Sequence, residues 1–165
     1  MSALPEPQLR LRPMTLSDLD AVAAIEAQAY AFPWSRGNFV DSLAAGYWCT
    51  LLEADGEALG YTIAQPGVDE LHLLNVTVAP SQQGRGRGSR LLGALEAAAS
   101  AHDLEGVWLE VRQSNLRAQS LYRRRGYREA GRRRRYYPAP GGREDAILMT
   151  LALPGARRGT GDDLD

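Results

Sequence analysis

One short segment constrains the fold of this 165-residue chain more than any other, and it reads VAPSQQGRGRGSRLL from Val78 to Leu92. An apolar run ends at Val78, a proline follows, and Gly84, Gly86 and Gly88 alternate just before a helical pattern begins. Glycine lacks a Cβ, so the backbone can take unusual dihedral angles and approach a ligand closely. A helix N-terminus adds free N–H groups and a partial positive charge. The segment therefore predicts a strand, an anion-binding loop and a helix, as in proteins that bind a phosphorylated cofactor.

Two common phosphate-binding loops do not fit this glycine spacing. A P-loop ends in Gly-Lys-Ser/Thr, and this chain has no lysine, since all 19 of its basic residues are arginine. The dinucleotide pattern G-x-G-x-x-G needs a third glycine where Ser89 or Leu91 stands. The pattern Q-x-x-G-x-G does fit, at Gln83, Gly86 and Gly88. A glycine-rich turn before a helix that binds nothing is the structural alternative.

Composition indicates one globular domain with its own core. Hydrophobic residues make up 44% of the chain and charged residues 24%, close to the globular average, and the net charge of −1 gives no general attraction for polyanions. The single cysteine, Cys49, excludes an internal disulfide. The chain shows no signal-peptide pattern and no apolar run of the roughly 18 residues that a membrane span needs. We expect a cytoplasmic protein without membrane association, a single domain over residues 9–153, and flexible termini at 1–8 and 154–165.

Hydrophobic periodicity predicts an α/β fold. Strands are expected at 9–13, 47–53, 57–64, 70–78, 106–111, from 127 onward and at 145–151, and helices at about 17–30, 35–44, 88–102 and 115–125. The helix between the strands at 70–78 and 106–111 implies a parallel crossover. The order of elements therefore predicts a mixed sheet flanked by helices on both faces.

A second segment, LEVRQSN followed by LY, places polar residues around a strand end. Glu110 lies near the end of the strand, Asn115 begins the next helix, and Tyr122 follows two turns along the same helix face. Combined with the glycine loop, this layout resembles the GCN5-related N-acetyltransferases, the GNAT superfamily. The segments LNVTV, FPWS, RYYP and GREDAILM further resemble the RimI family of ribosomal-protein-alanine N-acetyltransferases, over roughly residues 10–152.

The resemblance implies a fold and a reaction. The fold is that of the GNAT enzymes, with a mixed, mostly antiparallel central sheet. The reaction is transfer of an acetyl group from acetyl-CoA to the N-terminal α-amino group of a protein, by direct attack in a ternary complex. The implied acceptor is the N-terminal alanine of small-subunit ribosomal protein eighteen. No metal is implied, and His72 and His102 match no metal-ligand spacing, so we interpret both as ordinary structural or surface residues.

The resemblance also assigns roles to residues. Glu110 is the general base, through water, because an α-ammonium with a pKa of about 7.7–8.0 must lose a proton before it attacks. Tyr122 is the acid that protonates the leaving thiolate, and a backbone N–H near Val78 supports the thioester oxygen. The implied cofactor-binding residues are Val76, Thr77, Val78, Gly84, Arg85, Gly86, Arg87, Gly88, Ser89 and Asn115. The structural alternatives are a salt-bridging carboxylate for Glu110, a packing aromatic for Tyr122, and a helix N-cap for Asn115, where both roles are compatible.

Arginines are concentrated in the last third of the chain. Between Arg112 and Arg143 there are eleven arginines against one acidic residue, Glu129. One interpretation is a solvated basic face, and the other is weak contact with the ribosome or RNA through Arg123–Arg135. Basic charge without interleaved aromatic stacking platforms is a weak signal for nucleic acid.

Two alternatives to the implied reaction stay open. The first keeps acetyl transfer but changes the acceptor to lysine side chains or a small-molecule amine. The second is a non-catalytic ribosome- or RNA-binding module that uses the arginine-rich stretch. The presence of Glu110 and Tyr122 favours an enzyme, since a pure binding module needs neither. The lack of coiled-coil heptads and of long exposed apolar segments predicts a monomer.

Overall fold

The computed structural model describes residues 7–154, which fall into two compact units. Unit 1 comprises the chain up to Ile63 together with Asn75–Leu91, and unit 2 comprises Ala64–Leu74 and the chain from Leu92 on. Most of the termini expected to be flexible, 1–8 and 154–165, lies outside the described residues. The domain limits 9–153 stay a prediction.

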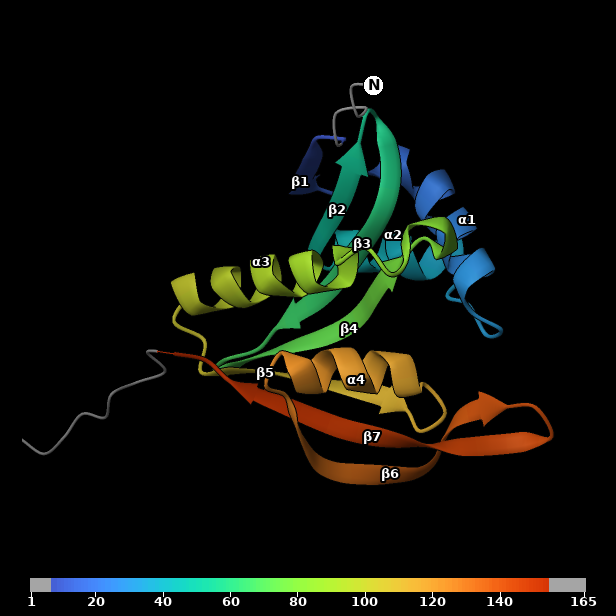
Figure 1. The fold of residues 1–165 in the computed structure, drawn as a ribbon, viewed down its shortest axis with the longest axis vertical. Helices are drawn as coiled ribbons and strands as arrows, with labels where there is room; N and C mark the ends of the chain where they lie inside the picture. Colours follow the sequence, from blue (N-terminus) through green and yellow to red (C-terminus); the bar gives the residue numbers. More distant parts are fainter. Residues whose placement is uncertain (1–6, 155–165) are drawn as a thin grey trace, which may run out of the picture. The chain divides into compact units, whose positions relative to one another are not determined.

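The order of helices and strands is the one expected from the sequence (Figure 1). The strands are β1 (Leu9–Pro13), β2 (Trp48–Ala54), β3 (Glu57–Pro66), β4 (Glu70–Val78), β5 (Gly106–Arg112), β6 (Arg128–Ala139) and β7 (Gly142–Ala152). The helices are α1 (Leu19–Ala29), α2 (Arg36–Ala44), α3 (Arg87–Ala101) and α4 (Leu116–Arg124), with short 3-10 turns η1 (Leu16–Asp18) and η2 (Pro80–Gln82). No helix among residues 7–154 is long and apolar enough to cross a membrane.

The strands form one seven-stranded sheet in the order β1-β2-β3-β4-β5-β7-β6. Strands β4 and β5 are parallel, as the intervening helix predicts, with Glu70 opposite Gly106 and His72 opposite Trp108. The pairs β1–β2, β5–β7 and β6–β7 are antiparallel. The prediction of a mixed, mostly antiparallel sheet flanked by helices is therefore confirmed.

The last hairpin is longer than the apolar pattern indicated (Figure 1). Strand β7 begins at Gly142 rather than at residue 145, because Gly142 and Arg143 pair with Ala139 and Pro138 of β6. These pairs are made by the backbone at the tip of the hairpin and need no apolar alternation. The register shifts between Arg133 and Tyr137, so β6 is locally irregular there. Hydrophobic periodicity alone could not show this extension.

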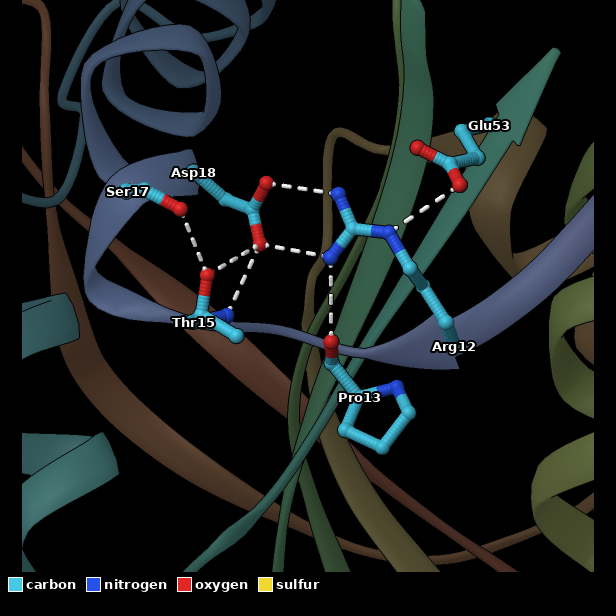
Figure 2. Close-up of polar contacts among 6 residues, drawn as sticks. All are labelled: Arg12, Pro13, Thr15, Ser17, Asp18 and Glu53. Atoms are coloured by element: carbon cyan, nitrogen blue, oxygen red, sulfur yellow. Dashed lines mark hydrogen bonds and ion pairs between the residues drawn. The ribbon is translucent and has the colours of Figure 1, made fainter. Parts of the chain in front are cut away.

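Arg12 of β1 ties the start of the first helical segment to the sheet in unit 1 (Figure 2). Its Nη1 and Nη2 donate to the Asp18 carboxylate at 2.8 and 2.7 Å, and its Nε lies 3.0 Å from Oε1 of Glu53 on β2. Asp18 also accepts from the backbone N–H of Thr15, completing the reciprocal capping box that begins η1. One guanidinium thus connects β1, β2 and the entry to α1.

Replacing Asp18 by asparagine should make the protein less stable at neutral pH. The Arg12 guanidinium lowers the pKa of Asp18 from 3.8 to about 2. A carboxyl group with a lowered folded-state pKa stabilises the fold above its unfolded-state value, and this contribution is lost as the pH falls through the folded-state value. The free energy of unfolding of Asp18→Asn should lie about 1–2 kcal/mol below wild type at pH 7, and the difference should shrink between about pH 4 and pH 2.

Asp20→Asn is the matched control for this prediction. Asp20 pairs with Arg36 at 3.0 Å, but the two side chains are 90% and 53% exposed, and exposed pairs contribute little. Urea unfolding of both variants at several pH values measures the contrast. Equal losses in the two variants would contradict the role given to Asp18.

Candidate functional site

The glycine loop of unit 1 connects the end of β4 to the start of α3. Gly84 and Gly86 have φ angles of 78° and 76°, which side-chain-bearing residues rarely adopt. Gln83 donates from Nε2 to the carbonyl of Val78 at 3.2 Å, and the N–H of Arg90 donates to the carbonyl of Gly86 at 3.1 Å. The first side chain of the Q-x-x-G-x-G pattern therefore anchors the loop to the strand end. Gly88 lies within α3, so the left-handed conformation is confined to the first two glycines.

The N-terminus of α3 carries the features expected of an anion site. Arg87, Gly88 and Ser89 form its first turn, where backbone N–H groups lie at the positive end of the helix dipole. The Nε of Arg87 is buried and has no hydrogen-bond partner among the described residues, whereas the Arg85 side chain is exposed. A buried donor without a partner is costly and is usually satisfied by a ligand or water. The residues at this helix start fit an anionic group.

In unit 1, the backbone of β3 comes very close to the end of β4. A Cβ added at Gly60 of β3 would lie 2.6 Å from the carbonyl oxygen of Thr77 and 3.3 Å from the Cα of Val78. Only glycine leaves room for this approach. The N–H of Ala79 then donates to the carbonyl of Leu59 at 2.8 Å. Together these contacts fix the course of Val76–Val78.

A buried polar network holds the same segment from the α1 side. Glu26 is only 1% exposed, and its Oε1 accepts from the Tyr61 hydroxyl at 2.8 Å and from Nδ2 of Asn75 at 2.7 Å. Thr77 donates to Oδ1 of Asn75 at 2.7 Å, and the Tyr30 hydroxyl lies 2.8 Å from Oγ1 of Thr77. Burial raises the pKa of Tyr30 to about 12, so its hydroxyl keeps its proton at neutral pH. The Thr77 side chain is thus hydrogen-bonded within the protein, and the Tyr30 hydroxyl also donates to the backbone carbonyl of Val76 at 3.1 Å.

Glu110 lies on β5 in unit 2, and its side chain is 8% exposed. Its Oε2 is 3.1 Å from Nε of Arg133 on β6, without hydrogen-bond alignment, and this oxygen is buried with no hydrogen-bond partner among the described residues. The Tyr137 hydroxyl donates to the Glu110 backbone carbonyl at 3.2 Å. A buried carboxylate oxygen that keeps a free acceptor site can receive a proton or bind a donor from a ligand.

His72 of β4 lies beside the same carboxylate. Its Nε2 is 3.8 Å from Oε1 of Glu110, and its ring stacks on Trp108 with the centroids 3.5 Å apart and the planes 8° from parallel. Burial, and secondarily the charge of Arg133, lowers the pKa of His72 below its usual value. The imidazole is therefore neutral at neutral pH. Unit 2 thus places an imidazole, a carboxylate and a guanidinium together.

Helix α4 carries the other two residues predicted in this region. Asn115 is its N-cap and accepts from the N–H of Ala118 at 3.1 Å, as the structural alternative expects. Buried Gln119 donates to the carbonyls of Arg112 and Gln113 at 3.0 and 2.9 Å, which fastens α4 to the end of β5. Tyr122 is 6% exposed. The predicted convergence of Tyr122 and Asn115 with Glu110 stays a prediction.

The arginine-rich stretch is not a uniform basic face. Arg125 forms hydrogen bonds of 2.6 to 3.1 Å with the Glu96 carboxylate, Arg132 pairs with Glu129 at 3.2 Å, and Arg133 faces Glu110. Three of these arginines therefore have acidic partners inside unit 2. Contact with the ribosome or RNA through Arg123–Arg135 stays a prediction.

Sequence analysis missed several groups that surround the predicted residues. His72 and Arg133 were not recognised as neighbours of Glu110, and Glu26 was not recognised as a buried anchor of β4. The predicted parallel pairing of β4 with β5 was one indication that His72 lies near Glu110, because this pairing places the two residues on the same face of the sheet. Nothing in the sequence pattern locates Arg133, since the irregular register of β6 determines where its side chain lies.

Comparison with known proteins establishes the family. The model of the acetyltransferase (GNAT) family matches residues 19–127. The chain belongs to the acetyltransferase (GNAT) family. It is 40% identical over 137 residues to the [ribosomal protein bS18]-alanine N-acetyltransferase of Escherichia coli strain K12, covering 83% of this chain and 93% of the relative.

Solved structures agree with this assignment. The crystal structure of the ribosomal-protein-S18-alanine N-acetyltransferase from Escherichia coli matches with a TM-score of 0.87 and 36% identity, over 94% of this chain and 99% of that one. The structure of yncA, a putative acetyltransferase from Salmonella typhimurium with its cofactor acetyl-CoA, matches with a TM-score of 0.75 over 95% of this chain and 99% of that one. At 18% identity, the second match shows a shared fold. This GNAT protein is therefore an acyltransferase, and the non-catalytic interpretation is wrong.

Gly60→Ala should destabilise the protein, because the new Cβ would collide with the backbone of β4. The expected loss is about 1–3 kcal/mol in the free energy of unfolding, the usual cost of overpacking. Gly37→Ala is the control, since a Cβ there would come no closer than 3.6 Å to Oγ of Ser35. Urea unfolding should show the control unchanged or slightly more stable. Full stability of Gly60→Ala would mean that β3 and β4 do not need this close approach.

Proposed function

We propose that this GNAT enzyme transfers the acetyl group of acetyl-CoA to the α-amino group of the N-terminal alanine of ribosomal protein bS18. The observation that carries the reaction is the Glu110 carboxylate, whose side chain is 8% exposed and whose Oε2 has no hydrogen-bond partner among the described residues, although it lies 3.1 Å from Nε of Arg133. The likeness to the Escherichia coli enzyme, at 40% identity over 93% of its length, supports this acceptor.

The backbone groups proposed to bind the cofactor are those of the glycine loop and of Val76–Val78. The backbone N–H groups of Gly84 to Ser89 and the buried Nε of Arg87 would bind the pyrophosphate of coenzyme A. The backbone of Val76–Val78 would bind the pantetheine arm in the manner of an added strand. Asn115 keeps its predicted cofactor contact in addition to its cap. These residues fit the group because the loop is anchored at Gln83 and carries a buried donor that needs an anionic partner.

Glu110 would prepare the acceptor for attack. Acetyl-CoA supplies the acetyl group as a thioester, and the amine must be neutral to attack it. At neutral pH an α-amino group is mostly protonated, because its pKa is about 7.7–8.0. Glu110 would take this proton through water, and Arg133 lies 3.1 Å from Oε2 of the carboxylate.

Tyr122 would supply the proton that the departing thiolate needs. It is a buried tyrosine on α4, and Gln119 of the same helix is hydrogen-bonded to the end of β5. A backbone N–H near Val78 would stabilise the negative charge that develops on the thioester oxygen. The predicted mechanism thus uses one base, one acid and one backbone donor.

Mass spectrometry of an acceptor peptide tests the proposed function. The peptide carries the N-terminal sequence of bS18, including an internal lysine, and is incubated with the enzyme and acetyl-CoA. We expect one added acetyl group, located on the α-amino nitrogen of alanine, and no reaction with a peptide whose N-terminus is blocked. Acetylation of lysine instead would contradict the proposed acceptor. Failure to bind coenzyme A in calorimetry would contradict the reaction itself.

Glu110→Gln and Tyr122→Phe should separate chemistry from cofactor binding. Removing the base or the acid should lower kcat by about 100-fold or more, because general acid–base catalysis contributes roughly 10²–10⁴. The dissociation constant of coenzyme A should stay within about twofold of wild type, since neither residue is assigned to cofactor binding. A wild-type turnover rate in either variant would remove that residue from its role.

A further inference from the structure

His72 is a titratable residue of unit 2 that the proposed mechanism does not use. It lies on β4 opposite Trp108 of β5, and the next residue of β5 on the same face is Glu110. Stacking on Trp108 fixes the orientation of the imidazole ring. In this orientation, Nε2 of His72 lies 3.8 Å from Oε1 of Glu110. The fold therefore holds a nitrogen base beside the carboxylate that receives the substrate proton.

His72 and Arg133 lie near different oxygens of the Glu110 carboxylate. Its side chain is 8% exposed, and Arg133 lies against Oε2. On the Oε1 side lies His72, whose side chain is 21% exposed. The imidazole thus has contact both with Glu110 and with solvent.

The chemistry of an imidazole suits this position. Its ordinary pKa, near 6.5, is closer to the pKa of an α-ammonium than that of any carboxyl group, and a base whose pKa lies near the working pH transfers protons most effectively. Burial and the charge of Arg133 lower the pKa of His72, so the ring begins each turnover neutral and can accept a proton. The resulting imidazolium would then be stabilised by the neighbouring carboxylate.

We propose that His72 is a proton relay that receives the acceptor's proton from Glu110 and releases it to solvent. The inference rests on the proposed function of Glu110 as the base. The two side chains, 3.8 Å apart at Nε2 and Oε1, first move to hydrogen-bond distance. The O–H bond of protonated Glu110 then breaks as an N–H bond forms at Nε2 of His72, which restores the carboxylate beside an imidazolium. Water then takes the proton from the imidazolium, so the pair returns to its starting state and no other reactant is needed.

Several charged groups in this region bear on the titration of His72. Arg133 of β6 opposes its protonation, and Glu110 of β5 favours it. Further charged residues occupy nearby positions of the strands: Glu70 of β4, two residues before His72, and Arg112 of β5 with its partner Glu144 of β7. After burial, the charge of Arg133 is the main cause that lowers the pKa of His72.

His72→Phe removes the relay nitrogen but keeps an aromatic ring to stack on Trp108. At pH 7 the value of kcat/KM with the N-terminal alanine peptide should fall about tenfold, a modest share of general-base catalysis. The deficit should shrink to about twofold or less at pH 9.5, because the α-amino group then arrives already neutral. A merely structural role would lower the rate by the same factor at every pH.

Two further measurements make the test specific. His72→Ala leaves space beside Trp108, and added imidazole should restore part of its activity at pH 7 while leaving His72→Phe unchanged. His102→Phe is the matched control, since His102 is the only other histidine of the chain and is exposed on the surface. This control should keep the wild-type rate and pH profile.

The outcomes separate this inference from the proposed function. If wild type acetylates the peptide while His72→Phe keeps its rate, or loses the same factor at every pH, the relay is wrong and the proposed function stands. If wild type modifies no amine, the proposed function fails and the relay falls with it. If His72→Phe no longer binds coenzyme A in calorimetry, the activity of His72→Ala with added imidazole becomes the deciding measurement. If imidazole restores no activity to that variant, the relay is wrong.

Discussion

The parallel pairing of β4 with β5 is the constraint that brings His72 and Glu110 together in unit 2. Parallel strands need a crossover, and here α3 belongs to the connection between the two strands. The register of this pairing, with His72 opposite Trp108, places the imidazole on the face that carries Glu110. A shift by one residue would turn His72 to the other face and separate the two groups.

Each unit contains a buried carboxylate, and the two carboxylates differ in their hydrogen bonds. Glu26 accepts three hydrogen bonds, from Tyr61, Asn75 and the backbone N–H of Trp34, so its carboxylate is engaged in holding the end of β4. Glu110 instead has one carboxylate oxygen without a hydrogen-bond partner among residues 7–154. Because such an oxygen is costly to bury, the contrast distinguishes Glu26, whose carboxylate is held by hydrogen bonds within unit 1, from Glu110, the carboxylate that we propose as the base.

Arginine contributes to the fold as well as to surface charge. Arg12 connects β1, β2 and the entry to α1, Arg125 binds Glu96 through two nitrogens, and Arg133 lies against Glu110. A planar guanidinium presents several donors in fixed directions, so one side chain can bridge two carboxylates or hold one at two points. The concentration of arginine in this lysine-free chain therefore does not by itself indicate a nucleic-acid surface.

The sequence by itself determined the order of strands and helices, the glycine loop and the family, because periodicity, turn residues and the Q-x-x-G-x-G spacing are local properties. It also placed Glu110 at a strand end and Asn115 at a helix start, for the same reason. Only the tertiary structure decided which side chains surround Glu110. Those neighbours come from β4 and β6, and their positions depend on the register with which these strands join the sheet. Register is set by pairing between segments distant in the chain, which no local pattern records.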